Sequence, residues 1–385
     1  MVKRVKLGLS FLHYKNSGVI NYLYSIIKAL DTLPDEQKPL IVAFYYDKAA
    51  IEGIDDKLYP YLRFEPTSFE MGPQSPFKQW INSWSLKWFN TYWLKEYVSP
   101  EKADCIYPMF PYEAQFNRIR KKIHWMVDFN YRHMRQNYSE TEYAYFTRIE
   151  SEIMESGNEV VVSSNQVLED LRHFYPHHRN NVHVLKFTAV LPSFEEIDIE
   201  EVRQKFGIRG AYFISPNQFW PHKNHIVLLK AAKLLQARGH QFQIVFTGNT
   251  KPGTSDDYFL FLKSFVEEHR LQKVISFLGS VDRKEQLQLI KNALSIVQPS
   301  LFEGWSTLIE EGKALQQFMV VSDLPIHREQ IDYNCAFFDP ADEQALAGQL
   351  ERILIAGADK EMRDYSVNIR AFAHQIQQMI GGSKN

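Results

Sequence analysis

The sequence has little cysteine, almost no net charge and no long apolar run. Its 385 residues include two cysteines, Cys105 and Cys335, each within a separate apolar run. This excludes a disulfide framework or thiolate metal site and favours the reducing cytoplasm. The balance of 44 Lys+Arg and 46 Asp+Glu, a formal net charge of −2, fits neither a polybasic nucleic-acid-binding protein nor an acidic disordered tail. No window approaches the ~18 apolar residues of a membrane-spanning helix. The N-terminal apolar stretch ends at His13 without a cleavage site, so we interpret it as a strand.

The glycines do not form a dinucleotide-binding motif, because no G-x-G-x-x-G follows any predicted strand. The first strand-to-helix turn contains only Asn16-Ser17-Gly18-Val19. One glycine before a helix lets backbone N–H groups approach a phosphate or a sugar, but an ordinary turn also uses one glycine. Gly18 is therefore a candidate for a phosphate or acceptor loop, with a simple turn as the equal alternative.

Short apolar runs alternate with segments of helical periodicity, which predicts an α/β protein with parallel sheets covered on both faces. At ~150 residues per domain, the length suggests two domains. The periodicity breaks near 188–210, so we predict a domain over 1–195 and another over 205–361, with an amphipathic run at 362–380 that can pack back on the first. The strands are predicted at 3–12, 39–46, 104–110, 121–129, 159–164, 211–216, 241–248, 273–280, 294–300, 319–323 and 335–338.

The most informative stretch is 299–315, which follows an apolar strand. Gly304 allows a tight turn, and Ser306 or Thr307 can cap the next helix, whose free N–H groups and positive dipole end form an anion site. Glu303 precedes this helix and Glu311 lies about one turn into it, so the two carboxylates can accept hydrogen bonds from hydroxyl groups. The pattern predicts a phosphate site flanked by polyol acceptors; the alternative is a solvated acidic helix start.

This pattern resembles the E-x7-E signature of family 4 glycosyltransferases, which have the GT-B fold of two facing Rossmann-like doubly wound domains with a central cleft. The resemblance implies that Glu303 contacts the donor sugar as the catalytic carboxylate and that Glu311 holds the ribose of the nucleotide. It also implies that the intervening turn binds the diphosphate. The donor-binding residues in that turn and the start of the helix are Gly304, Trp305, Ser306, Thr307 and Leu308.

The run 213–225 resembles the phosphate-binding loop of the same family. Lys223 matches the family's Lys, but the expected Arg is absent, with Asn217 or Gln218 near its place. His222 and His225 have helical i,i+3 spacing, yet without an acidic or Cys partner they predict capping or lining rather than a metal pair.

Two further strand ends resemble the donor domain of the family. The runs 245–248 and 276–281 each end a strand with glycine, and the resemblance adds Gly248 and Val281 to the donor-binding residues, with the backbone of Val281 facing the base.

The run 123–133 resembles an Asp-Phe-Gln-His-x-His loop of similar sugar transferases. Asp128 and His133 match, and Tyr131 stands at the first His. The resemblance makes Asp128 and His133 catalytic candidates, because a histidine there can donate to a sugar hydroxyl or line the acceptor site. The alternative is a loop histidine bonded to backbone.

Two features suggest what the acceptor is. Residues 118–135 hold six Lys/Arg against one Asp, which fits either a phosphate-bearing acceptor or a strand edge protected by lysine. Trp80, Trp84 and Trp88 lie at i, i+4 and i+8. With nearby lysines, this stripe fits either a helix in a membrane interface or core packing. Those lysines are Lys78, Lys87 and Lys95.

We predict a retaining GT-B glycosyltransferase that transfers a sugar from a UDP- or GDP-sugar to a polysaccharide or lipid-linked saccharide. No D-x-D follows a strand, so we expect no metal and no further cofactor. The expected location is cytoplasmic, with peripheral contact at the inner membrane face as an open alternative. Two other functions stay open: a nucleotide-sugar epimerase of the same architecture and a non-catalytic nucleotide-sugar-binding protein.

Overall fold

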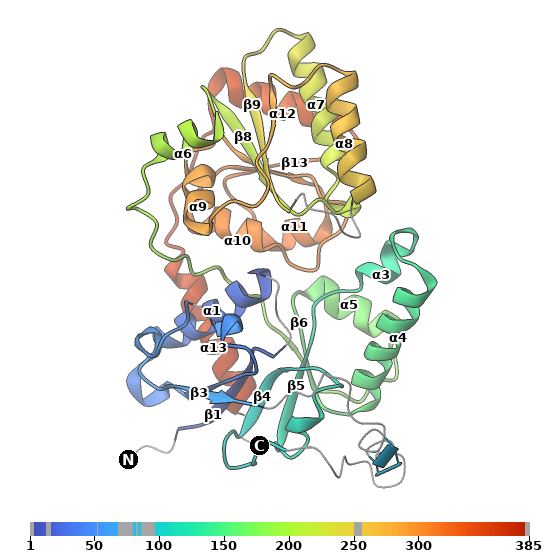
Figure 1. Cartoon of the computed structure of the whole chain (residues 1–385), viewed down its shortest axis with the longest axis vertical. Helices are drawn as coiled ribbons and strands as arrows, with labels where there is room; N and C mark the ends of the chain where they lie inside the picture. Colours follow the sequence, from blue (N-terminus) through green and yellow to red (C-terminus); the bar gives the residue numbers. More distant parts are fainter. Residues whose placement is uncertain are drawn as a thin grey trace. The chain divides into compact units, whose positions relative to one another are not determined.

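The computed structural model describes residues 4–12, 17–51, 53–67, 80–81, 84–85, 97–249 and 256–381. The chain forms two compact units, each built around one sheet with helices on both faces (Figure 1). The first unit comprises Met1–Phe129, Glu140–Val190 and Ser366–Asn385, and the second comprises Asn130–Ser139 and Leu191–Tyr365.

The first unit has a parallel sheet of seven strands in the order β3-β2-β1-β4-β5-β6-β7. The strands are β1 (Lys6–Ser10), β2 (Leu40–Tyr45), β3 (Leu62–Pro66), β4 (Cys105–Met109), β5 (Lys121–Met126), β6 (Glu159–Val162) and β7 (Val182–Val184). Its helices include α1 (Ser17–Asp31), α4 (Glu140–Glu155), α5 (Asn165–Phe174) and α13 (Ser366–Gly381).

The second unit has a parallel sheet of six strands in the order β10-β9-β8-β11-β12-β13. The strands are β8 (Tyr212–Pro216), β9 (Gln243–Thr247), β10 (Ile275–Phe277), β11 (Ile296–Gln298), β12 (Met319–Ser322) and β13 (Cys335–Phe338). Its helices include α3 (Asn130–His133), α6 (Ile199–Phe206), α7 (His225–Ala237), α8 (Asp256–Glu268), α9 (Arg283–Lys291), α10 (Thr307–Ala314), α11 (Pro325–Gln330) and α12 (Glu343–Ala356).

Neighbouring residues of the central strands pack into different cores, because successive side chains of a strand point to opposite faces. On β12, Val320 belongs to the hydrophobic cluster that includes residues of α7 and α12. Met319 and Val321 belong to the cluster that includes residues of α9 and α10. Both faces of the sheet are therefore covered, which explains why its strands appear in the sequence as nearly continuous apolar runs.

Every run predicted as a strand contains a strand of the structure, but β3 and β7 are absent from the prediction. These two strands form the edges of the first sheet. β7 has three residues, all of them half-buried, and β3 contains Arg63 and Glu65 between its apolar residues. Short edge strands are only partly covered, so their sequences lack the apolar signal of buried strands.

The basic run 118–135 does not form a sheet edge, so the prediction of a lysine-protected edge is wrong. β5, which contains Lys121 and Lys122, lies between β4 and β6. Lys121 Nζ lies 2.9 Å from a carboxylate oxygen of Glu159 and donates to the backbone oxygen of Met379 at 2.6 Å. At least part of this basic run therefore stabilises the first unit. A phosphate-bearing acceptor stays a prediction.

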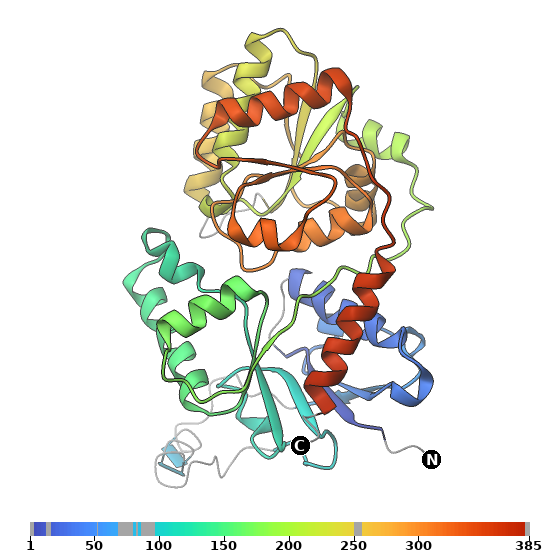
Figure 2. The ribbon, with the colours of Figure 1, turned by 180° about the vertical axis from the view of Figure 1, so that it is seen from behind.

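The C-terminal helix α13 packs on α1 within the first unit (Figure 2). Its apolar stripe, including Phe372, Ala373 and Ile376, is buried. Among the described residues, no helix is long and apolar enough to cross a membrane.

Candidate functional site

The candidate site of the second unit lies where its sheet order reverses. β8 and β11 are neighbours, and the chain adds strands outward on either side of them. In parallel α/β sheets, ligands bind beyond the carboxyl ends of the strands at this switch point. Asn217 directly follows β8 and Gln298 ends β11, so both lie at the expected edge. The fold alone therefore places these polar side chains at a ligand-binding position.

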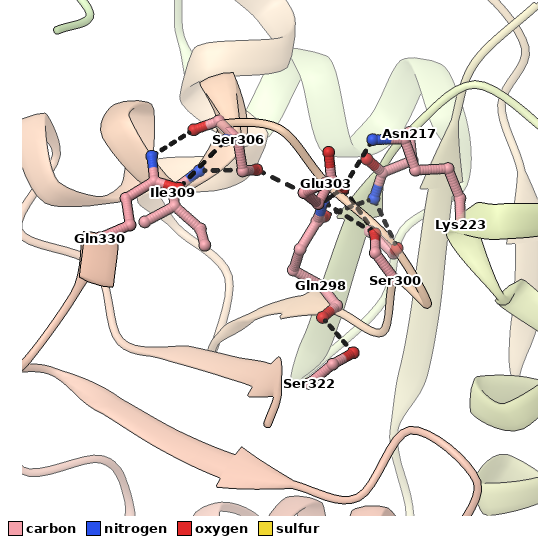
Figure 3. Close-up of polar contacts among 10 residues, drawn as sticks. Asn217, Lys223, Gln298, Ser300, Glu303, Ser306, Ile309, Ser322 and Gln330 are labelled. Carbon is pink, nitrogen blue, oxygen red and sulfur yellow. Dashed lines mark hydrogen bonds and ion pairs between the residues drawn. The ribbon is translucent and has the colours of Figure 1, made fainter. Parts of the chain in front are cut away.

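Gln298 connects the loops at this edge. Its side chain is fully buried; Oε1 accepts a hydrogen bond from Asn217 Nδ2 at 2.8 Å. Its Nε2 donates to Glu303 Oε1 at 2.6 Å and lies 3.1 Å from Ser300 Oγ and 3.4 Å from Ser306 Oγ (Figure 3). One buried amide thus ties the end of β8 to the loop between β11 and α10. The network fixes the shape of that loop without any ligand.

Glu303 is held by one of its two carboxylate oxygens. Oε1 accepts from Lys223 Nζ at 2.7 Å, Ser300 Oγ at 2.6 Å and Gln298 Nε2 at 2.6 Å. The side chain is 8% exposed, and that of Lys223 is 18% exposed. Within the described part of the chain, Oε2 accepts no hydrogen bond. The carboxylate is thus oriented at one oxygen while the other remains available as an acceptor.

The charge state of Glu303 follows from these contacts. Burial alone would raise the pKa of the carboxyl, but the Lys223 ammonium, His327 and the hydrogen bonds from Lys223 and Ser300 outweigh burial and lower the pKa to about 2. Glu303 is therefore a carboxylate at neutral pH. It can accept hydrogen bonds from a ligand but cannot serve as a proton donor there.

Ser306 caps α10 as predicted. Its backbone is extended at the N-cap, and its Oγ accepts from the N–H of Ile309 at 3.4 Å. Gln330 also binds the backbone of Ser306. Its Oε1 accepts from the backbone N–H of Ser306 at 3.0 Å, and its Nε2 donates to the backbone oxygen of Ser306 at 2.7 Å. The backbone N–H of Ser306 is therefore already hydrogen-bonded. Ser306 contributes to an anion site by capping α10 and not by donating this N–H.

α10 presents two adjacent glutamates with different roles. Glu310 is fully buried and accepts from Lys313, Gln330 and Tyr365 within the second unit. Glu311 accepts from Arg283 Nη2 at 2.6 Å through Oε1, and its side chain is 7% exposed. No hydrogen bond from a described residue reaches Glu311 Oε2. Glu310 therefore holds the helix in place, while Glu311, like Glu303, keeps one oxygen for a ligand.

Close backbone packing fixes two further positions. A Cβ atom at Gly248 would lie 2.4 Å from the backbone oxygen of Asn217, so the end of β9 can approach the loop after β8 only with glycine there. A Cβ atom at Gly312 would lie 2.4 Å from Met319 Sδ. Glycine at this position of α10 therefore leaves room for the side chain of Met319 on β12.

The remaining donor candidates occupy the same unit in different surroundings. Gln218 is exposed, and its Oε1 accepts from the N–H of Asn249 at 3.0 Å. Leu308 is buried in the apolar core, and Val281 packs partly against that core. Gly304 and Trp305 are buried, and Thr307 is the first residue of α10. The side chain of Leu308 therefore supports the site by packing.

The helical spacing of His222 and His225 is misleading. Asn224 between them has a left-handed backbone with φ of 55°, which separates a short 3-10 turn (Pro221–Lys223) from α7. His225 is fully buried against Phe219, and burial lowers its pKa to about 3. Burial also lowers the pKa of His222 to about 4. Both are neutral at physiological pH, and the described residues contain no group of three His, Cys, Asp or Glu side chains that could hold a metal.

The two catalytic candidates from the first half of the sequence belong to different units. Asp128 is half-buried, two residues beyond β5, in the first unit. His133 ends α3 and belongs to the second unit, where its ring stacks on Phe302 with 5.1 Å between ring centroids. Phe302 directly precedes Glu303. Within the second unit, the structure thus brings His133 to the loop of Glu303.

Two other predictions fall wholly or partly outside the described residues. Gly18 is the second residue of α1, and the turn before it, 13–16, is not described. Trp80 and Trp84 are 65% and 43% exposed, so neither indole is core packing. Trp88 lies outside the described residues, as do Lys78, Lys87 and Lys95. Membrane contact therefore stays a prediction.

Sequence reasoning missed three residues that shape the site: Gln298, Arg283 and Gln330. Gln298 could have been recognised as a polar residue that ends an apolar strand. Arg283 and Gln330 could not be recognised from the sequence, because they are ordinary polar residues on helices. Only the fold brings Arg283 to Glu311 and Gln330 to Ser306.

Comparison with known proteins shows what the second unit is similar to. Residues 198–371 match the model of the family described as "Glycosyl transferases group 1". The second unit therefore resembles the group 1 glycosyl transferases over this range. Over 173 residues the chain is 26% identical to the O-antigen chain mannosyltransferase RfbU of Salmonella typhimurium. That match covers 45% of this chain and 46% of RfbU, so the chain aligns with about half of this relative.

Solved structures share the fold over nearly the whole chain. Anabaena Alr3699/HepE, in complex with UDP and glucose, has a TM-score of 0.64 at 15% identity, covering 98% of this chain and 97% of that chain. WaaG, a glycosyltransferase involved in lipopolysaccharide biosynthesis, has a TM-score of 0.59 at 13% identity, covering 99% of this chain and 96% of that chain. These likenesses confirm the predicted GT-B fold. Assignment to family 4 stays a prediction.

Proposed function

We propose that this chain transfers a sugar from a nucleoside diphosphate sugar to a saccharide acceptor. The observation that carries the proposal is the shared arrangement of Glu303 and Glu311. Each carboxylate has one oxygen bonded to a cation, Lys223 or Arg283, while the other accepts nothing from the described residues. Sugar and ribose hydroxyls are donors that such oxygens bind.

The second unit offers three groups suited to the diphosphate. The N-terminal end of α10 carries a partial positive charge, capped by Ser306. Lys223 lies 2.7 Å from Glu303, so its ammonium can interact with both the carboxylate and a nearby phosphate. Arg283 neutralises Glu311, which reduces repulsion of an anionic donor. These contacts support a transfer in which fixed charges stabilise the departing diphosphate, without a role for metal.

We assign the two glutamates different roles in the transfer. With a pKa near 2, Glu303 stays ionised and would orient the donor sugar through its hydroxyls. Glu311 would hold the ribose. His133, stacked on the residue before Glu303, would contact the sugar or the acceptor. Retention of the anomeric configuration follows from the resemblance to family 4, and we assign no nucleophile.

The relatives suggest which donors and acceptors to test first. One is a mannosyltransferase of O-antigen chains, and a structural neighbour was solved with UDP and glucose. We therefore propose a hexosyl donor on UDP or GDP and an acceptor that is a growing polysaccharide or its lipid-linked precursor.

The test is nucleotide release from a panel of UDP- and GDP-sugars, with and without a saccharide acceptor. Glu303→Gln keeps the size of the side chain and removes its charge, so it should leave binding of the bare nucleotide nearly intact and lower turnover, because its contacts are made with the sugar. A product formed without acceptor would instead indicate an epimerase. Binding with no release from any donor would indicate a non-catalytic protein.

A further inference from the structure

Arg283, the first residue of α9, links Glu311 to the end of a neighbouring strand. Its Nη2 donates to Glu311 Oε1 at 2.6 Å, and its Nη1 donates to Gln286 Oε1 at 3.0 Å. Gln286 Nε2 in turn donates to Thr247 Oγ1, at the end of β9, at 2.8 Å. A continuous chain of hydrogen bonds therefore runs from β9 through α9 to α10.

This chain determines which way the Glu311 carboxylate points. The side chain is 7% exposed, and Arg283 supplies the one hydrogen bond to it from the described residues. A planar guanidinium held at two of its nitrogens fixes direction as well as charge. The neighbouring Glu310 contrasts with this arrangement, since three donors from α10, α11 and Tyr365 hold it inside the unit. Unlike Glu310, Glu311 is oriented by a single cation, and no described residue donates to its Oε2.

We propose that Arg283 is a positioning residue that makes the donor site selective for ribonucleotides. It binds Oε1 of Glu311 and thereby directs Oε2 to the ribose hydroxyls. The inference rests on the proposed function, because it takes Glu311 as the ribose acceptor. Arg283 acts through Glu311, so its loss should reduce the preference for ribose over 2′-deoxyribose more than it reduces affinity for the diphosphate.

The expected preference for ribose over 2′-deoxyribose follows from the strength of a hydrogen bond between a hydroxyl and a carboxylate. A hydrogen bond between a hydroxyl and a carboxylate changes affinity by about tenfold or more. We therefore expect the wild type to bind UDP or GDP at least about tenfold more tightly than the corresponding 2′-deoxynucleotide. Without Arg283, the Glu311 side chain can adopt other orientations, which weakens its hydrogen bonds to the ribose.

Calorimetric titration with UDP, GDP and their 2′-deoxy forms tests the proposal on the full chain. The variants are Arg283→Gln, Arg283→Lys and the control Lys284→Gln. Lys284 is the next residue on the same helix, and its partner is Glu196 instead of Glu311. Arg283→Gln should lower the ribose preference by about fivefold or more. Arg283→Lys should keep part of it, and Lys284→Gln should keep all of it.

The outcomes separate this inference from the proposed function. If the wild type binds neither UDP nor GDP, the proposed function fails. If the wild type prefers ribose and both Arg283 variants keep the full preference, the inference alone is wrong. Equal losses for ribose and deoxyribose forms would also overturn it, because they would indicate a direct contact with the phosphates or a general structural role. Thermal melting identifies a variant that does not fold, and Arg283→Lys then decides the test.

Discussion

The ion pair between Lys223 and Glu303 should make the second unit sensitive to acid and to loss of the lysine. The pKa of Glu303 falls from an ordinary 4.5 to about 2. At 1.36 kcal/mol per pKa unit, this difference corresponds to about 3 kcal/mol of folding free energy. Both side chains are largely buried, so solvent screening reduces this value little.

The sign of the pH dependence follows from the lowered pKa. The carboxylate is stabilised in the folded state, so this contribution is complete above the unfolded pKa of 4.5 and is lost as pH falls toward 2. Lys223→Met leaves Glu303 buried without its cation, and breaking a buried pair costs about 3–5 kcal/mol. We expect Lys223→Met to lower the free energy of unfolding by about 3 kcal/mol at pH 7 and by about half of that or less at pH 3.

Urea unfolding of the wild type and variants at pH 7 and pH 3 measures this effect. The double variant Lys223→Met with Glu303→Gln removes both charges and should recover most of the loss at pH 7. The same loss at both pH values would contradict the reasoning. So would a double variant as unstable as Lys223→Met alone, because Glu303 would then not be the group that needs the lysine.

Three further predictions concern backbone packing, metal and membrane. Gly248→Ala should destabilise the second unit by about 1–3 kcal/mol in thermal or urea unfolding, because its Cβ would lie 2.4 Å from the Asn217 oxygen; unchanged stability would show that the two loops separate freely. Sugar transfer should survive EDTA, since Lys223 and α10 supply the positive charge; an absolute requirement for Mg²⁺ or Mn²⁺ would refute this. Co-sedimentation with liposomes should require anionic lipid, weaken with salt and decrease for Trp84→Ala with Trp88→Ala; no binding, or unfolding of the variant, would count against membrane contact.

Much of the architecture was predictable because buried parallel strands leave a strong apolar signal. β8 and β12 alternate between two cores and so appear as continuous apolar runs. β3 and β7 lie at the edges and lack this signal. One backbone conformation could not be predicted from the sequence either. Asn224 has a left-handed conformation that the spacing of His222 and His225 did not indicate.

The site was predictable to the extent that its residues are close in sequence. Glu303 and Glu311 were found by their spacing around a strand-to-helix turn, and Ser306 by its capping position. Their ion pairs were not predicted, because Lys223 contacts Glu303 across 80 residues of sequence and Arg283 contacts Glu311 across 28. The fold decides these contacts. Lys223 was identified through the family resemblance, whereas Arg283 required the structure.

The proposed function requires the second unit to bind a nucleoside diphosphate through Glu311. The most direct measurement is calorimetric titration of UDP and GDP into the wild type and Glu311→Ala. We expect at least one nucleotide to bind the wild type, and the variant to lose about 1.5–3 kcal/mol of binding free energy, as for a hydrogen bond to a charged group. Equal affinities for the two proteins, or no binding of either nucleotide to the wild type, would contradict it.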